Sequence, residues 1–220
     1  NVHGIIVLNA YNERLLRLLA ETQIPKVFLD TSSLVAPDEL NGDLLLMESR
    51  TSVRRITCHL LEQGRTLPGF IGDISYAQSN RERYEGFCQA LADAGKKVDS
   101  SLCLTTPLGI DTYREEIDTF LSSLSRMPDA FVCASDYVAC ILMQLLEKRG
   151  LRVPEDVAVS GFDNNTEDLL AEHLTTVQVF NEELGARLAL QILYRIKYPN
   201  TPHEITYLGT NVLYRDSTGD

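Results

Sequence analysis

The stretch that decides the fold is Gly150-Leu-Arg-Val-Pro-Glu-Asp-Val-Ala-Val-Ser-Gly-Phe-Asp-Asn164. Its centre, residues 156–161, is a short apolar run introduced by Pro154, which predicts a buried β-strand. Gly150 is a C-cap signal that ends a helix predicted over residues 137–148. A second apolar run at residues 130–134 precedes that helix. Strand, helix and strand in this order predict parallel strands covered on both faces.

The same alternation extends outward to both ends of the chain, with no Gly/Ser linker and no low-complexity tract. It predicts a doubly wound α/β architecture, in which any two lobes are joined by crossings between sheets. Strands are expected at residues 4–8, 26–30, 41–47, 69–73, 102–104, 130–134, 156–161, near Val177, 205–208 and 211–214. Helices are expected at residues 12–21, 51–62, 81–94, 113–125, 137–148 and 182–198.

Composition and charge exclude several classes of protein. The 220 residues are 44% hydrophobic and 23% charged, as in an ordinary folded domain. Lys and Arg number 20 against 31 Asp and Glu, a net charge of −11, so this segment is not expected to contact DNA phosphates itself. No apolar run is long enough to cross a membrane, and no membrane partner is expected. The first residues lack the basic and apolar regions of a secretory signal.

Motifs for catalysis, metal binding and cofactor binding are missing from the sequence. Five cysteines without a C-x-x-C pair predict reduced, buried thiols, as in the cytoplasm. The four histidines have no metal-ligand spacing, so no metal is expected. Neither a nucleophile elbow nor a glycine-rich phosphate loop occurs. We therefore predict neither an enzyme nor a cofactor.

Four predicted strands finish in an acid, and these acids are candidate ligand contacts. In open α/β sheets, ligands lie outside the carboxyl ends of the strands, where carboxylates can accept hydrogen bonds from hydroxyl groups. Each acid also has a local alternative, which is helix capping for Asp136 and Asp30 and turn formation for Asp73 and Asp163.

Aromatic side chains and one arginine could complete such a crevice. Aromatic rings can pack on the apolar face of a sugar, and a planar guanidinium can bind two oxygens. Core packing is the alternative for Phe162 and Phe180, and a solvated helix start is the alternative for Arg83. The aromatic candidates are Tyr11, Tyr76, Phe162 and Phe180.

Several motifs together resemble the lactose/galactose-repressor (LacI/GalR) family of regulators. Residues 150–164 are similar to the family's G-L-x-V-P-x-D-V-S-V-x-G-F-D-D over their whole length. Asn80-Arg-Glu-Arg-Tyr-Glu-Gly-Phe87, with Gly95 after it, resembles N-R-x-R-x-x-G-F-x-x-A-L-x-x-x-G. Residues 128–136, 174–177 and 212–218 match shorter family motifs, so the resemblance covers essentially the whole chain.

This resemblance implies the type I periplasmic-binding-protein-like fold, with two doubly wound parallel-sheet lobes and a ligand between them. The N-terminal lobe would comprise residues 1–67 and 178–208, and the C-terminal lobe residues 68–177 and 209–220. The crossings would lie near Leu67, Val177 and Gly209. The match begins at the family's third strand, so we expect an incomplete first lobe with an exposed sheet edge.

The resemblance also implies a set of effector contacts. By position these fall on Asp30, Arg83, Ser135 and Asp163, and near Leu108 and Phe180. Asn9 and Tyr11 complete the predicted ligand-binding residues. This chain departs from the family pattern in two places, because Ser135 replaces an asparagine and Val179 replaces a polar residue.

The function that follows is the effector-sensing and dimerisation domain of a bacterial, cytoplasmic transcription regulator. A small molecule, expected to be a sugar, would bind between the lobes and control a DNA-binding headpiece absent from this chain. Operator DNA would be contacted only through that headpiece, and the helix over residues 137–148 is a candidate homodimer face. One alternative is an extracytoplasmic sugar-binding protein of the same fold. Another is an α/β enzyme acting on a sugar or nucleoside.

Overall fold

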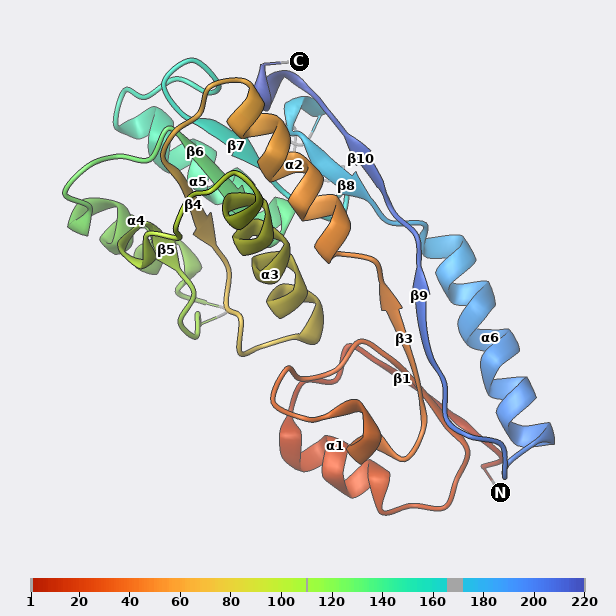
Figure 1. The fold of residues 1–220 in the computed structure, drawn as a ribbon. Helices are drawn as coiled ribbons and strands as arrows, with labels where there is room; N and C mark the ends of the chain where they lie inside the picture. Colours follow the sequence, from red (N-terminus) through yellow and green to blue (C-terminus); the bar gives the residue numbers. More distant parts are fainter. Residues whose placement is uncertain (1, 110, 166–171, 220) are drawn as a thin grey trace.

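The computed structural model describes residues 2–109, 111–165 and 172–219, and it contains two parallel four-stranded sheets (Figure 1). The first sheet has the strand order β1-β2-β3-β9 and the second has the order β5-β4-β6-β7. An antiparallel ribbon of β8 and β10 accompanies the second sheet. The strands are β1 Ile5–Leu8, β2 Lys26–Leu29, β3 Asp43–Met47, β4 Pro68–Ile71, β5 Cys103–Leu104, β6 Ala130–Cys133, β7 Ala158–Ser160, β8 Thr176–Gln178, β9 Ile205–Leu208 and β10 Asn211–Leu213.

Helices cover both faces of each sheet, which confirms the predicted doubly wound α/β fold. In the first sheet, Phe28 and Leu44 pack with Leu16 of α1, whereas Val27 and Leu45 share a core with Leu188 of α6. This alternation follows from the two-residue period of a strand. The helices are α1 Glu13–Ala20, α2 Arg50–Glu62, α3 Gln78–Asp93, α4 Tyr113–Ser123, α5 Asp136–Lys148 and α6 Asn181–Lys197.

The chain crosses between the sheets earlier than the sequence predicted. The expected crossing near Leu67 is wrong, because α2 packs against α3 and Phe87 joins Val53 and Ile56 in one core. The crossing instead lies at residues 48–49, just before α2. We call α1, α6 and the first sheet the first body, and α2 to α5 with the remaining strands the second body. The chain returns to the first body after β8 and leaves it again between β9 and β10.

The outer strand of the first sheet is exposed, as the sequence analysis expected. β1 pairs only with β2, and the side chain of Leu8 is 58% exposed. The helix α5, the candidate dimer face, is largely buried within the protein. Eight of its 13 residues are buried and pack with α4 and the second sheet, and Tyr137 is one of its exposed residues. Within the described residues, no helix combines the length and apolarity needed to span a membrane.

Candidate functional site

A cavity of about 370 Å³ lies between the two bodies, at the carboxyl ends of both parallel sheets. Its volume is within the range of small-molecule sites. The first body contributes Asn9, Tyr11, Asp30 and Met47, which follow or end β1, β2 and β3. The second body contributes Asp73, Ser79, Arg83, Ser135 and Asp163, which follow β4, β6 and β7 or lie on α3. Six of the predicted ligand-binding residues therefore meet at one cavity.

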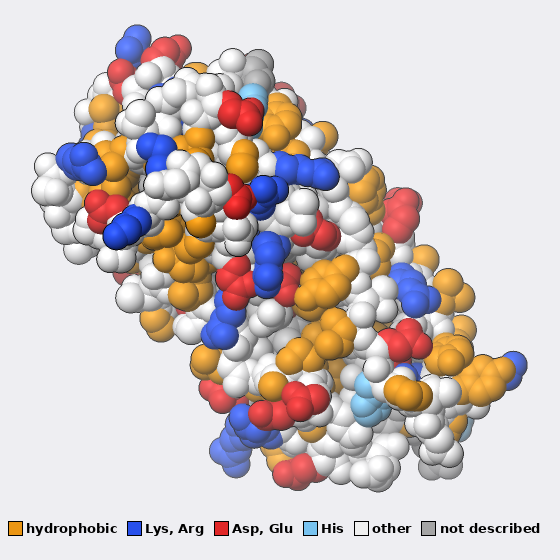
Figure 2. Space-filling view, viewed as in Figure 1, with side chains coloured by type: hydrophobic (Ala, Val, Ile, Leu, Met, Phe, Trp, Pro, Cys, Tyr) orange, Lys and Arg blue, Asp and Glu red, His pale blue; other side chains and the backbone are white. Residues whose placement is uncertain are grey.

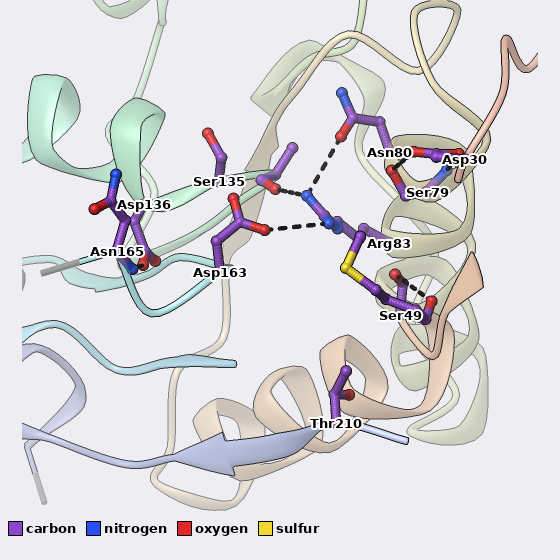
Figure 3. Close-up of polar contacts among 12 residues, drawn as sticks. Asp30, Ser49, Ser79, Asn80, Arg83, Ser135, Asp136, Asp163, Asn165 and Thr210 are labelled. Atoms are coloured by element: carbon purple, nitrogen blue, oxygen red, sulfur yellow. Dashed lines mark hydrogen bonds and ion pairs between the residues drawn. The ribbon is translucent and has the colours of Figure 1, made fainter. Parts of the chain in front are cut away.

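Asp30 joins the first body to the beginning of α3. It follows β2 in a left-handed conformation (φ 56°), which Asp tolerates better than most residues. Its carboxylate accepts hydrogen bonds from Ser79 Oγ (2.6 Å) and from the backbone nitrogens of Thr31 (2.8 Å) and Ser79 (3.3 Å). Figure 3 shows Asp30 and Ser79 facing each other across the two bodies. A buried carboxylate from the first body thus caps a helix of the second.

Tyr11 and Tyr76 form an aromatic wall of the cavity. Their ring centroids lie 4.3 Å apart, and the Tyr11 hydroxyl donates to Asp30 Oδ2 at 3.3 Å. Burial, together with the negative charge of Asp30, raises the pKa of Tyr11 far above its ordinary value. The phenol therefore stays protonated and remains a hydrogen-bond donor.

Arg83 is the cation of the site, and only 4% of it is exposed. Its guanidinium donates to the carbonyl oxygen of Ala134 and lies 3.7 Å from the centre of the Phe162 ring. Nη2 is 3.5 Å from Asp163 Oδ1, and Figure 3 shows this pair beside Asn80. The Nε atom has no hydrogen-bond partner among the described residues. Phe162 is thus a core residue beneath the arginine, as its local alternative predicted.

Asp163 presents its carboxylate to the cavity, since its side chain remains 43% exposed. It has a positive φ of 110°, a backbone conformation that is uncommon for residues other than glycine. Burial by the surrounding protein raises the pKa of Asp163, and the charge of Arg83 opposes this rise. Of the three acids that line the cavity, Asp163 makes the fewest described contacts within the protein.

The other two acids at strand ends have local roles. Asp73 accepts hydrogen bonds from Ser75 Oγ (2.6 Å) and from the backbone nitrogens of Ser75 (2.8 Å) and Tyr76 (3.1 Å), so it forms the turn that was its alternative. Asp136, a candidate ligand contact, does not line the described cavity, and its local alternative of capping α5 is wrong. Ser135 is the N-cap and accepts from the backbone nitrogen of Val138 at 3.3 Å, while also lining the cavity.

Two predicted contacts lie outside the described cavity wall. Leu108 is buried elsewhere, and Phe180 is 36% exposed at the position before α6. The neighbours of Phe180 on each side, Val179 and Asn181, line the cavity instead. Sequence reasoning also missed Tyr113 and Asn181 as wall residues. Both are the first residue of a helix, and helices that follow parallel strands begin at the carboxyl edge of the sheet, so this signal was available.

No metal centre accompanies the cavity. Among residues 2–109, 111–165 and 172–219, no cluster of His, Cys, Asp and Glu could hold a metal ion. Charges of both signs are interspersed on the face drawn in Figure 2, which shows no continuous basic surface. The cavity is therefore a polar, partly aromatic enclosure between the two bodies.

Two parallel sheets that enclose a polar cavity at their carboxyl ends define the periplasmic-binding-protein-like class of fold. The family model described as a periplasmic binding protein-like domain matches residues 57–218. The chain belongs to this family, and it is similar to transcriptional regulators of the LacI type.

Relatives of known function support this placement. The chain is 29% identical over 220 residues to the HTH-type transcriptional repressor PurR of Aliivibrio fischeri, covering 98% of this chain and 64% of that protein. It is 31% identical over 170 residues to the HTH-type transcriptional regulator DegA of Bacillus subtilis, covering 76% of this chain and 48% of that protein. The chain thus spans less than two thirds of the length of these curated relatives.

Solved structures show the same fold. A complex of the transcriptional regulator CelR with cellobiose superposes with a TM-score of 0.86 at 27% identity, covering 99% of this chain and 66% of that one. A LacI-family regulator from Enterococcus faecium with bound ribose superposes with a TM-score of 0.77 at 22% identity, covering 98% and 79%. The fold is that of the effector-binding domain of a LacI-family regulator.

Proposed function

We propose that this chain is the effector-sensing and dimerisation domain of a LacI-type regulator, and that it binds a small molecule, a sugar, between its two bodies. The observation that carries the proposal is the meeting of Asp30, Arg83 and Asp163 at one cavity formed by the strand ends of both sheets. These residues come from separate strands and helices, and the fold alone does not require their polarity. They match the positions that the family resemblance implied for effector contacts.

The chemistry of the wall supports a sugar. The carboxylate of Asp163 and the side-chain amides of Asn9 and Asn181 can bind hydroxyl groups. The rings of Tyr11 and Tyr76 offer an apolar surface to one face of a pyranose or furanose. The sugar complexes of CelR and of the Enterococcus faecium regulator add support by likeness.

Regulation would operate through the relative position of the two bodies. Because three chain crossings connect them, a ligand that binds both walls favours one relative position over others. In a homodimer this shift would change how a DNA-binding headpiece, outside these 220 residues, meets its operator. The protein would bind and would not catalyse, like the repressors and regulators to which it is similar.

A cytoplasmic location follows from the regulatory role. The five cysteines, all within the described residues, form no disulfide, which suits a reducing compartment. An extracytoplasmic sugar receptor of the same fold is the alternative named from the sequence. Both would use the same cavity, and the similarity to transcription regulators favours the first.

Titration calorimetry with a panel of neutral mono- and disaccharides tests the proposal. We expect one or more of them to bind, and Asn181→Ala to weaken that binding about tenfold by removing a wall contact. Asn200→Ala, a matched change at an exposed position beyond α6, should leave affinity unchanged. Equal affinities of both variants and the unmodified protein would refute the cavity assignment.

A further inference from the structure

The cavity wall carries more negative than positive charge. Three carboxylates line it, those of Asp30, Asp73 and Asp163, against the guanidinium of Arg83 as the one cation among the described lining residues. That guanidinium is largely buried between the Phe162 ring, the Ala134 carbonyl and Asp163. An anionic ligand would have to displace the Asp163 carboxylate to reach it, while facing the other two acids. The wall therefore repels anions.

The helix ends at the cavity are also unfavourable for anions. Four helices begin at its wall, and the N-terminus of a helix ordinarily attracts a phosphate through free backbone N–H groups. Here each of the four has an acid of the protein at its first turn. Asp30 accepts from the Ser79 backbone nitrogen at the start of α3, whereas the first turns of the other helices carry Glu115 and Glu116 in α4, Asp136 in α5, and Glu182 and Glu183 in α6.

The three wall carboxylates differ in how far they are already hydrogen-bonded within the protein. Asp30 accepts from Thr31 and Ser79, and Asp73 accepts from Ser75 and Tyr76 through Oδ1. Asp163 faces the guanidinium of Arg83 at 3.5 Å. A hydroxyl can still donate to a remaining lone pair of Asp163 without changing the charge of the site.

We infer that the effector is a hydroxyl-rich molecule of mono- or disaccharide size that carries no negative charge, and that its phosphate ester is rejected. The size follows from the cavity volume of about 370 Å³, which lies at the small end for ligand sites. This inference rests on the proposed sugar-sensing function and narrows it. Sequence reasoning alone could not choose between a hydroxyl and a phosphate as the partner of Arg83.

The test is calorimetric titration of the chain with matched pairs, ribose and ribose 5-phosphate, glucose and glucose 6-phosphate, and adenosine and its 5′-monophosphate. Cellobiose completes the panel. We expect a neutral compound to bind and its phosphate ester to bind at least about tenfold more weakly.

A variant tests the electrostatic cause. The double change Glu182→Gln and Glu183→Gln removes the acids from the first turn of α6 and leaves every lining side chain in place. This variant should reduce the difference in affinity between the neutral compound and its phosphate ester, without altering the affinity for the neutral compound. The control is the same change of charge away from the cavity, Glu62→Gln together with Glu147→Gln, which should leave this difference in affinity unchanged.

The outcomes separate this inference from the proposal on which it rests. Tighter binding of a phosphate ester than of its neutral partner would overturn the exclusion of anions and leave the sensing function standing. An unchanged difference in affinity in the Glu182 and Glu183 variant would also count against it. Failure of every compound in the panel to bind would instead refute the sugar-sensing function itself.

Discussion

Asp136 shows how a single buried acid shapes the second body. Its carboxylate accepts from Thr176 Oγ1 at 2.6 Å and from the backbone nitrogen of Asn165 at 2.8 Å, which ties α5 to β8 and to the end of β7. Burial raises its pKa to about 6, although these hydrogen bonds and Arg215 oppose the rise. The charged form is therefore unfavourable in the folded protein relative to the unfolded chain.

This shift predicts a pH-dependent stability. A folded-state pKa above the unfolded value of 3.8 means that the folded protein holds the extra proton between those values. Stability should then fall as pH rises from 4 to above 6, by up to about 3 kcal/mol for this group. Denaturant unfolding of Asp136→Asn and the unmodified protein at pH 4 and 7 isolates it. The difference between the two proteins should change over this interval, and a constant difference would contradict the assignment.

The pair of Asp43 and Arg195 predicts a second effect on stability. Both side chains are almost fully buried, with Arg195 Nη2 2.5 Å from Asp43 Oδ1, and Gln191 and the Glu204 backbone also donate to the carboxylate. Asp43→Ala leaves an unpaired buried guanidinium and should cost about 3–5 kcal/mol of unfolding free energy. Asp93→Ala, which removes an exposed partner of Arg54, should leave the denaturation midpoint nearly unchanged. Similar losses in the two variants would be inconsistent with this reasoning.

The same carboxylate has a pH signature of opposite sign to that of Asp136. Burial alone would raise the pKa of Asp43, but the hydrogen bonds from Arg195, Gln191 and Glu204 outweigh it and lower the pKa. The stabilisation is therefore present above the unfolded pKa and is lost as pH falls through the folded one. Its loss is confined to acid below about pH 4.

Residue types at strand ends predicted part of the cavity wall, and the two failures have a common cause. Asp30 and Asp163 line the cavity just after β2 and β7, and Arg83 lines it from α3, at the position that the family motif implied. Leu108 and Phe180 do not, because a motif match fixes a position along a loop and not the direction of its side chain. Val179 and Asn181, the neighbours of Phe180 along the chain, line the wall instead.

At the scale of elements, helix periodicity and glycine caps located the six helices to within a few residues. The location of α2 in the fold was the exception. Its apolar face showed that it packs against something, but the pattern does not distinguish one sheet from another. The packing of α2 against α3 places α2 in the second body, and this close packing depends on Gly86.

Gly86 predicts a packing test of the α2–α3 contact. An added Cβ would lie 2.2 Å from the carbonyl oxygen of Arg50, which is backbone and cannot rotate away. Gly86→Ala should therefore destabilise the protein by about 1–3 kcal/mol in denaturant unfolding. Gly185→Ala, in α6 with no atom within 4 Å of the new Cβ, should be neutral or slightly stabilising because alanine favours helix. A neutral Gly86→Ala would refute the close approach.

At the scale of the whole molecule, several polar contacts connect the bodies beyond the chain crossings, and two of them involve a buried carboxylate and a side-chain hydroxyl. Ser79 Oγ donates to Asp30 at 2.6 Å, and the Tyr207 hydroxyl of β9 donates to Glu82 of α3 at 2.7 Å. Both place a buried carboxylate across from the opposite body. They favour the arrangement that encloses the cavity.

Removing one of these contacts should loosen that arrangement. Ser79→Ala deletes a hydrogen bond to a charged group, worth about 1.5–3 kcal/mol. We expect a larger radius of gyration by small-angle scattering without ligand, and sugar affinity at least about tenfold weaker. Ser123→Ala is the control, since the hydroxyl of that exposed residue donates within α4, to the Phe120 carbonyl oxygen at 2.7 Å. Identical scattering from Ser79→Ala and the unmodified chain would show that the bond does not hold the bodies together.

The chain crossings also determine when the second body can fold during synthesis. The second body is completed by residues far along the chain, because Ser217 Oγ accepts from Thr175 and donates to Val159, and β10 pairs with β8. During synthesis, the segment from β4 to β8 therefore lacks its hydrogen-bond partners at Thr175, Val159 and β8 until residues 211–218 have left the ribosome. Nascent chains stalled before residue 211 should remain accessible to protease, whatever the progress of the first body.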